Sequence, residues 1–143
     1  MKQYSILLFF LSLVFGQNDQ LFVGSRPLSM GGAFIAVADD ANAITWNSAG
    51  LPGLRRTEFT STYSDLYDMG ITQSYLGFVR PFNDRLAIGL DWSNIGYDDK
   101  ELAYSENKLC FAFGFQPLKK LSMGLTLKLS LIHISEPTRR WSI

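Results

Sequence analysis

Residues 108–116, KLCFAFGFQ, alternate a small or polar side chain with a bulky apolar one at every step. Because successive side chains of a β-strand point to opposite faces, this pattern predicts a strand with one bulky face and one small face. Residues 85–93 (RLAIGLDWS) and 121–128 (LSMGLTLK) repeat the pattern. Residues 57–64 and 71–82 are β-like with less distinct faces. We therefore predict an all-β fold, with five antiparallel strands between residues 56 and 128.

Strands with one bulky and one small face fit two architectures. In a soluble β-sandwich the bulky face forms the core, whereas in an outer-membrane β-barrel it meets lipid and the small face lines the lumen. Three features favour the barrel. The small faces carry Ala and Gly repeatedly, the strands have the length that a tilted membrane strand needs, and aromatic residues lie near the strand ends. These aromatic residues are Tyr75, Phe82, Trp92, Tyr97 and Phe115.

The connections between the strands support the barrel as well. Residues 82–84 and 117–120 predict tight turns, and residues 97–107 (YDDKELAYSEN) predict a long polar loop between them. Bacterial barrels have this rhythm of short periplasmic turns and longer external loops. Five strands cannot close a barrel, and lipid does not tolerate an open sheet edge. We therefore expect the chain to be the N-terminal part of an outer-membrane antiparallel β-barrel that continues past Lys128.

The two ends of the chain need separate treatment. Residues 1–16 combine Lys2 with a short apolar run, which predicts a cleaved signal peptide and hence export. This run is too short for a membrane-spanning helix, which needs roughly 20 apolar residues. Residues 129–139, LSLIHISEPTR, match the translation of a common transposase-based sequencing adapter. We therefore expect residues 129–143 to be an adapter-derived artefact, and we assign no function to the single histidine, His133.

Residues 17–55 separate the signal peptide from the first strand and contain no strand pattern. Their most distinctive part is residues 24–50, GSRPLSMGGAFIAVADDANAITWNSAG. The paired glycines Gly31 and Gly32 suit a close approach of the backbone to another element.

Local signals predict a short helix in this stretch. Asp39 or Asp40 can cap a helix over residues 41–46, because a carboxylate is favourable at a helix N-terminus. Residues 47–50 predict a turn, after which Pro52 prevents the helix from continuing.

The same stretch resembles the N-terminal signature of the PorV/PorQ family of outer-membrane proteins, which is related to the FadL superfamily of fatty-acid transport barrels. The resemblance covers roughly 28 residues and rests on four motifs in order. These are a Gly-x-Arg start, Met-Gly-Gly-Ala-Phe at residues 30–34, Ala-Asp-Asp at residues 38–40 and a Trp-Asn-x-Ala-Gly-Leu close at residues 46–51. The family has Pro where this chain has Ser48.

The resemblance implies that residues 17–55 form a hatch, a segment packed into or under the barrel. The polar residues Arg26, Asp39, Asp40, Asn42 and Asn47 would then face the lumen and hydrogen-bond to its wall. The full set of hatch candidates is Arg26, Gly31, Gly32, Asp39, Asp40, Asn42, Trp46 and Asn47. The alternative is that these residues provide only local capping and turn contacts that hold the segment in place.

Other candidate chemistry is sparse in the sequence. Asp98, Asp99 and Glu101 are interpreted as a solvated loop rather than a cation site, and Asp65 and Asp68 likewise. Cys110 is interpreted as a small buried residue. No Ser/His/Asp arrangement, metal-ligand cluster or phosphate loop occurs in the sequence, so we expect a non-enzymatic protein without cofactors. The formal net charge of zero predicts no nucleic-acid partner.

Three functions fit these expectations. The first is a PorV/PorQ-type barrel in the bacterial outer membrane, acting in transport or in protein secretion, with lipid and secretion-system proteins as partners. The second is a FadL-like channel for the uptake of hydrophobic small molecules. The third is a soluble exported β-domain.

Overall fold

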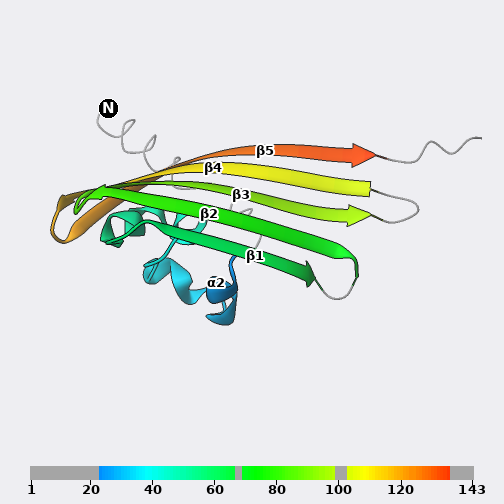
Figure 1. The fold of residues 1–143 in the computed structure, drawn as a ribbon, viewed down its shortest axis with the longest axis horizontal. Helices are drawn as coiled ribbons and strands as arrows, with labels where there is room; N and C mark the ends of the chain where they lie inside the picture. Colours follow the sequence, from blue (N-terminus) through cyan, green and yellow to red (C-terminus); the bar gives the residue numbers. More distant parts are fainter. Residues whose placement is uncertain (1–22, 67–68, 99–102, 136–143) are drawn as a thin grey trace, which may run out of the picture.

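The described part of the chain is mostly β. The computed structural model describes residues 23–66, 69–98 and 103–135. Within them, five strands form one antiparallel sheet in chain order (Figure 1). The strands are β1 (Glu58–Leu66), β2 (Ile71–Asn83), β3 (Leu86–Asp98), β4 (Ala103–Leu118) and β5 (Leu121–Ser135). The predicted all-β fold with five antiparallel strands is confirmed, and the sheet is open.

The connections agree with the sequence at one end of the sheet and differ at the other. The tight turns are confirmed, since Asn83 pairs with Leu86 and Leu118 with Leu121. The predicted long loop over residues 97–107 is wrong for most of its length, because Tyr97 pairs with Tyr104 as β3 and β4 continue. Polar side chains on neighbouring strands bond to one another and stabilise these extensions, so polar residues can remain in the sheet.

One such contact joins Asn94 and Asn107. The Asn94 Nδ2 donates to Asn107 Oδ1 at 3.1 Å and to Ser105 Oγ at 3.2 Å. Asp98 ends β3, whereas Asp99 and Glu101 lie outside the described residues. Asp65 is exposed in β1, and Asp68 also lies outside the described residues.

Strand β5 continues past the expected boundary at Lys128. It pairs with β4 along its length, with Leu129 opposite Leu109 and His133 opposite Ser105. The hydrogen bonds of strand pairing join backbone groups, so the pairing of β5 does not identify the origin of its sequence. The adapter origin of residues 129–143 therefore stays a prediction, as does the signal peptide at residues 1–16, which lies outside the described residues.

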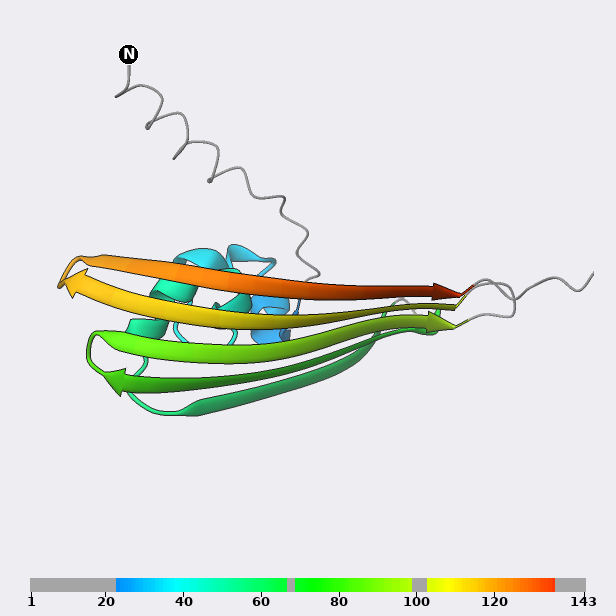
Figure 2. The same ribbon diagram turned by 90° about the horizontal axis from the view of Figure 1, so that it is seen from above.

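Short helical turns make up the segment before the sheet. We call residues 23–54 the N-terminal segment; it contains α2 (Ser25–Ser29), η1 (Ala33–Ala36), α3 (Ala43–Trp46) and η2 (Ser48–Gly53). It covers one face of the sheet, nearer the tight turns than the opposite end (Figures 1 and 2). We call the covered face the inner face and the opposite one the outer face.

The helix α3 ends at Trp46, as the sequence predicts, and Pro52 lies in the separate 3₁₀ helix η2 that follows the extended residue Asn47. The helix η2 includes Pro52 and reaches Gly53. The amides on either side of Pro52 donate to backbone carbonyls, from Gly50 to Asn47 and from Leu54 to Leu51. The missing N–H of proline leaves both of these bonds intact, so a short 3₁₀ turn accommodates it.

The sheet presents its bulky and small faces to different surroundings. Outer-face side chains such as Phe111, Phe113 and Ile88 are 41–51% exposed. Inner-face residues under the N-terminal segment are mostly small, with the fully buried Tyr75 as a large exception, and they pack against apolar side chains of the segment. The resulting core consists of Phe34, Ala38, Ala41, Ala43, Ile44, Trp46, Leu51, Leu54, Val79, Ala87, Cys110 and Ala112. The core therefore lies on the small face, opposite to its position in a sandwich.

Candidate functional site

The N-terminal segment sits on three glycines of the inner face. A Cβ added to Gly89 would lie 2.5 Å from Ile44 Cγ1, and one added to Gly114 would lie 2.7 Å from Ser48 O. A Cβ at Gly124 would overlap Ser48 Oγ. Contacts under 3.0 Å are incompatible with packed atoms, so each glycine makes room for the segment. The repeated glycines noted in the sequence thus form the seat of the segment.

Ser48 occupies the centre of this seat. It is only 9% exposed and contacts both Gly114 and Gly124. The turn at this position is set by Asn47, whose Oδ1 accepts from the Ala49 amide at 3.2 Å. A side-chain cap therefore provides the local order that a proline would otherwise supply at Ser48.

An exposed ionic cluster holds distant parts of the segment together. The Arg26 Nη1 lies 2.6 Å from Asp39 Oδ1 and 2.7 Å from Asp40 Oδ2. The guanidinium also lies 5.5 Å from the Phe34 ring centroid, in cation–π geometry. The hydrogen bond from Arg26 lowers the pKa of Asp39 below its ordinary value. Arg26 thereby ties α2 to the residues that precede α3.

Asp40 also starts the turn that leads into α3. Its Oδ1 accepts from the Asn42 amide at 2.7 Å and from Asn42 Nδ2 at 2.8 Å. The expected capping role of Asp39 or Asp40 is wrong, because α3 begins at Ala43, two residues later than predicted, and its N-cap is Asn42, without a side-chain cap. Asp40 instead orders the turn before the helix with one carboxylate oxygen, while Arg26 binds the other.

Trp46 and Asn47 bind backbone carbonyls within the segment. The Trp46 Nε1 donates to Val23 O at 2.9 Å, and its ring meets Phe34 edge-on with centroids 6.3 Å apart. Asn47 Nδ2 donates to Ile35 O at 2.9 Å. These contacts join α3 to the start of the segment and to η1, so they stabilise its internal shape.

Gly31 has a different role from the one expected of the paired glycines. A Cβ on Gly31 would meet nothing within 4 Å, so this glycine does not serve a close approach. Both residues have positive φ, 61° for Gly31 and 80° for Gly32. This left-handed turn between α2 and η1 favours glycine for its backbone freedom.

The polar hatch candidates do not bond to the sheet as expected. Among the described residues, the side chains of Arg26, Asp39, Asp40, Asn42 and Asn47 find their hydrogen-bond partners inside the N-terminal segment. The reason is geometric, because these residues lie on turns that fold back on one another. The structure brings the candidates together as an internal scaffold.

The hydrogen bonds to the sheet come from Ile44 and Thr45, which sequence reasoning missed. Thr45 Oγ1 donates to Asp91 Oδ2 at 2.6 Å and lies 3.5 Å from Tyr75 Oη. Thr126 Oγ1 donates to Ile44 O at 3.4 Å. The available signal was Asp91, a carboxylate on an inner face otherwise formed by Ala, Gly and Ser in its strand.

The inner face becomes polar beyond this contact, towards the β3–β4 connection. Glu106 accepts from Lys108 Nζ, Tyr104 Oη and Ser130 Oγ, each at 2.9 Å. Glu106 is 7% exposed, and in this arrangement its charge is paired. The inner face thus has two zones, a seat of small residues under the segment and a polar zone farther along the strands.

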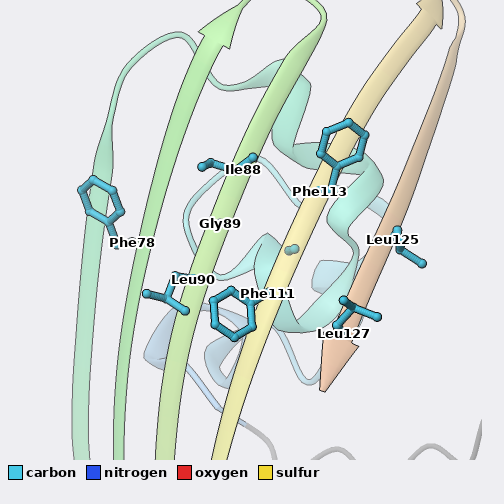
Figure 3. A pocket seen from close by; sticks show the side chains of 9 residues that line it. Phe78, Ile88, Gly89, Leu90, Phe111, Phe113, Leu125 and Leu127 are labelled. Atoms are coloured by element: carbon cyan, nitrogen blue, oxygen red, sulfur yellow. The ribbon is translucent and has the colours of Figure 1, made fainter. Parts of the chain in front are cut away.

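The outer face carries an apolar hollow of about 450 Å³. Figure 3 shows its side chains on the side of the sheet opposite to the N-terminal segment. They come from β2 to β5 and include Phe78, Ile88, Leu90, Phe111, Phe113, Leu125 and Leu127.

In the parts of the chain that the structure describes, no three His, Cys, Asp or Glu side chains gather as a metal site would require. No helix there has the length and apolar character needed to cross a membrane.

A scan of protein-family models gave no match, and searches of curated proteins and of solved structures gave none.

Proposed function

We propose that this chain is the N-terminal part of an outer-membrane β-barrel of the PorV/PorQ type. In this proposal the outer face meets lipid, the inner face lines the lumen, and the N-terminal segment is the hatch. The protein is non-enzymatic and acts in transport or protein secretion across the bacterial outer membrane. The resemblance of residues 24–50 to that family suggested the proposal, and the arrangement of the two faces supports it.

The observation that carries the proposal is the exposure of the bulky face. Fully burying a Leu or Phe side chain is worth about 1.5–3 kcal/mol, so a water-facing sheet with many such residues would be unfavourable. Here Leu125 and Leu127 are 61% and 64% exposed, next to the exposed Phe111 and Phe113. Lipid tails would remove this surface from water without any second protein layer.

The length of the apolar surface along β4 is compatible with a membrane strand. On β4 the outer-face positions from Leu109 to Phe115 are all apolar. Seven residues at about 3.3 Å per step give roughly 20 Å along the strand. A strand tilt of about 40° leaves roughly 15 Å of height, which fits within the apolar band of about 25 Å in bacterial barrels. Trp92 lies opposite Leu109, and the next outer-face pair is Asn94 and Asn107. An aromatic residue followed by polar ones is typical of a membrane interface.

The polar inner face favours an aqueous lumen over a purely apolar path. Between the seat and the β3–β4 connection, the inner face carries the Glu106–Lys108 ion pair and the buried side chains of Gln73 and Ser93. Such a surface suits the handling of polar cargo, including polypeptides. It supports the transport or secretion role over FadL-like uptake of hydrophobic molecules, which calls for an apolar inner pocket.

Membrane fractionation tests the location of the protein. We expect it in the outer-membrane fraction, with a gel mobility that shifts on heating in detergent, as folded barrels show. Recovery of all the protein in the periplasmic fraction would favour the soluble β-domain and contradict the proposal.

A deletion strain separates the two membrane roles. Loss of secreted proteins with normal uptake of labelled fatty acid is expected for the secretion role. Intact secretion together with reduced fatty-acid uptake would instead favour the FadL-like channel.

A further inference from the structure

A buried carboxylate lies where the N-terminal segment touches the sheet. Asp91 is 2% exposed, and it accepts from the Thr45 hydroxyl at 2.6 Å. Within the sheet, Asp91 is paired in register with Gly77 on one side and Cys110 on the other. The next residue across the sheet from Cys110 is Lys128. Thr45 therefore supplies to Asp91 a partner that does not belong to the sheet.

This contact differs in kind from the rest of the seat. The segment otherwise meets the inner face through apolar and small residues, as between Ile44 and Gly89, and through one uncharged hydrogen bond from Thr126 Oγ1 to Ile44 O. A buried carboxylate that loses a hydrogen-bond partner is penalised unless water replaces that partner. If the segment lifts into an aqueous lumen, water reaches Asp91 at the same moment. The Thr45–Asp91 hydrogen bond therefore forms only while the segment is closed, and water takes its place when the segment lifts.

The segment is also built to move as a unit. Arg26 ties α2 to Asp39 and Asp40, and Trp46 ties α3 to Val23. These contacts stay inside the segment, so they need not break when it leaves the sheet.

We propose that the Thr45–Asp91 hydrogen bond is the latch that keeps the hatch closed on the inner face. This inference rests on the proposed function, in which the N-terminal segment is a hatch. Thr45 and Asp91 are positioning residues that set the fraction of time for which the seat is covered.

Cys110 provides a built-in reporter of opening. It is the single cysteine of the chain, and it is 3% exposed beside Asp91, beneath the segment. Modification by a water-soluble maleimide in outer-membrane preparations measures how often the segment lifts, because labelling of a covered site follows the population of the open form. We expect slow labelling of the wild-type protein.

Replacing Thr45 by valine removes the hydroxyl and keeps the side-chain shape. A hydrogen bond to a charged group is worth enough that its loss should accelerate labelling roughly tenfold to a hundredfold. Thr45→Ser retains the hydroxyl and should restore slow labelling.

Thr62→Val is the matched control. Thr62 lies in β1 opposite Tyr75, and its Oγ1 has no hydrogen-bond partner among the described residues. This variant should label at the wild-type rate. Heat-modifiable mobility, measured on every variant, shows that the barrel has formed.

The outcomes separate the latch from the proposed function. Equal labelling of Thr45→Val and wild type, with heat-modifiable mobility preserved, would overturn the latch and leave the barrel standing. Equal acceleration by Thr62→Val and Thr45→Val would also overturn it, since any buried threonine would then suffice. Absence of the wild-type protein from the outer membrane would overturn the barrel itself.

Discussion

Ile44 packs directly onto the backbone of Gly89, leaving no space for a side chain at that position. A Cβ on Gly89 would lie 2.5 Å from Ile44 Cγ1 and 3.1 Å from Ile44 Cδ1. Ile44 is fully buried in α3, whereas Gly89 is the fourth residue of β3. The glycine therefore determines how closely the N-terminal segment approaches the sheet.

Gly89→Ala should displace the segment. Overpacking a close contact costs about 1–3 kcal/mol, and here the clash falls on an apolar side chain between two elements. We expect faster maleimide labelling of Cys110 and lower resistance to urea. Gly96→Ala in the same strand is the control, because its Cβ would meet Thr72 Oγ1 at an ordinary 3.6 Å. Similar effects of both variants would show that strand glycines act through flexibility instead of through the seat.

A charge in the middle of the outer face should destabilise the membrane form. Phe113→Arg places a cation in the apolar surface next to Leu125, its partner in register. The expected cost is about 2–4 kcal/mol for an arginine at the bilayer midplane. The measurement is the urea or guanidinium midpoint of the protein folded in lipid vesicles.

Phe82→Arg is the control for that substitution. Phe82 is 55% exposed beside the tight turn between β2 and β3, where the proposed orientation places the membrane edge. The same change should cost about 0–1 kcal/mol there. Equal costs at both positions would contradict a lipid-facing outer surface.

The Asp39 carboxyl should titrate below an ordinary aspartate. Arg26 lowers the pKa of Asp39, and an ordinary aspartate titrates near a pKa of about 3.9. A carboxyl with a lowered folded pKa adds stability above its unfolded pKa. This contribution is lost as the pH falls through the folded pKa. Carbon-13 NMR of the Asp39 carboxyl should show a low midpoint that rises in Arg26→Gln.

Salt provides a second check on that pair. Arg26 and Asp39 are both well exposed, with side-chain exposures of 44% and 55%. Exposed ion pairs are weak and screened, so the difference between wild type and Arg26→Gln should shrink at high ionic strength. A midpoint unaffected by Arg26→Gln would show that the ion pair does not form in solution.

The Trp46 indole should anchor the start of the segment. Its Nε1 donates to Val23 O at 2.9 Å in a buried position. Trp46→Phe keeps an aromatic ring against Phe34 and removes this donor, leaving a buried carbonyl without its indole partner. We expect a cost of about 1–3 kcal/mol, visible as faster proteolysis near Val23. Trp92→Phe, on the outer face, should leave proteolysis there unchanged.

The local part of this fold could be predicted from the sequence. Strand positions and tight turns follow from the alternation of Leu, Phe, Ala and Gly, because side-chain direction in a strand is a property of neighbouring residues. Residues 24–50 could be recognised as a separate segment because they lack this alternation. The full length of β3 and β4 could not be predicted, because Asn94 and Asn107 stabilise each other only once the strands lie side by side.

The contacts across the molecule were decided by the tertiary structure. Alternation predicts a bulky and a small face, but packing shows that the small face carries the N-terminal segment and the bulky face stays exposed. Thr45 and Asp91 are 46 residues apart in the chain, and no sequence pattern pairs one with the other. Their hydrogen bond exists because Gly89 lets α3 approach the sheet closely enough for a hydroxyl to reach a buried carboxylate.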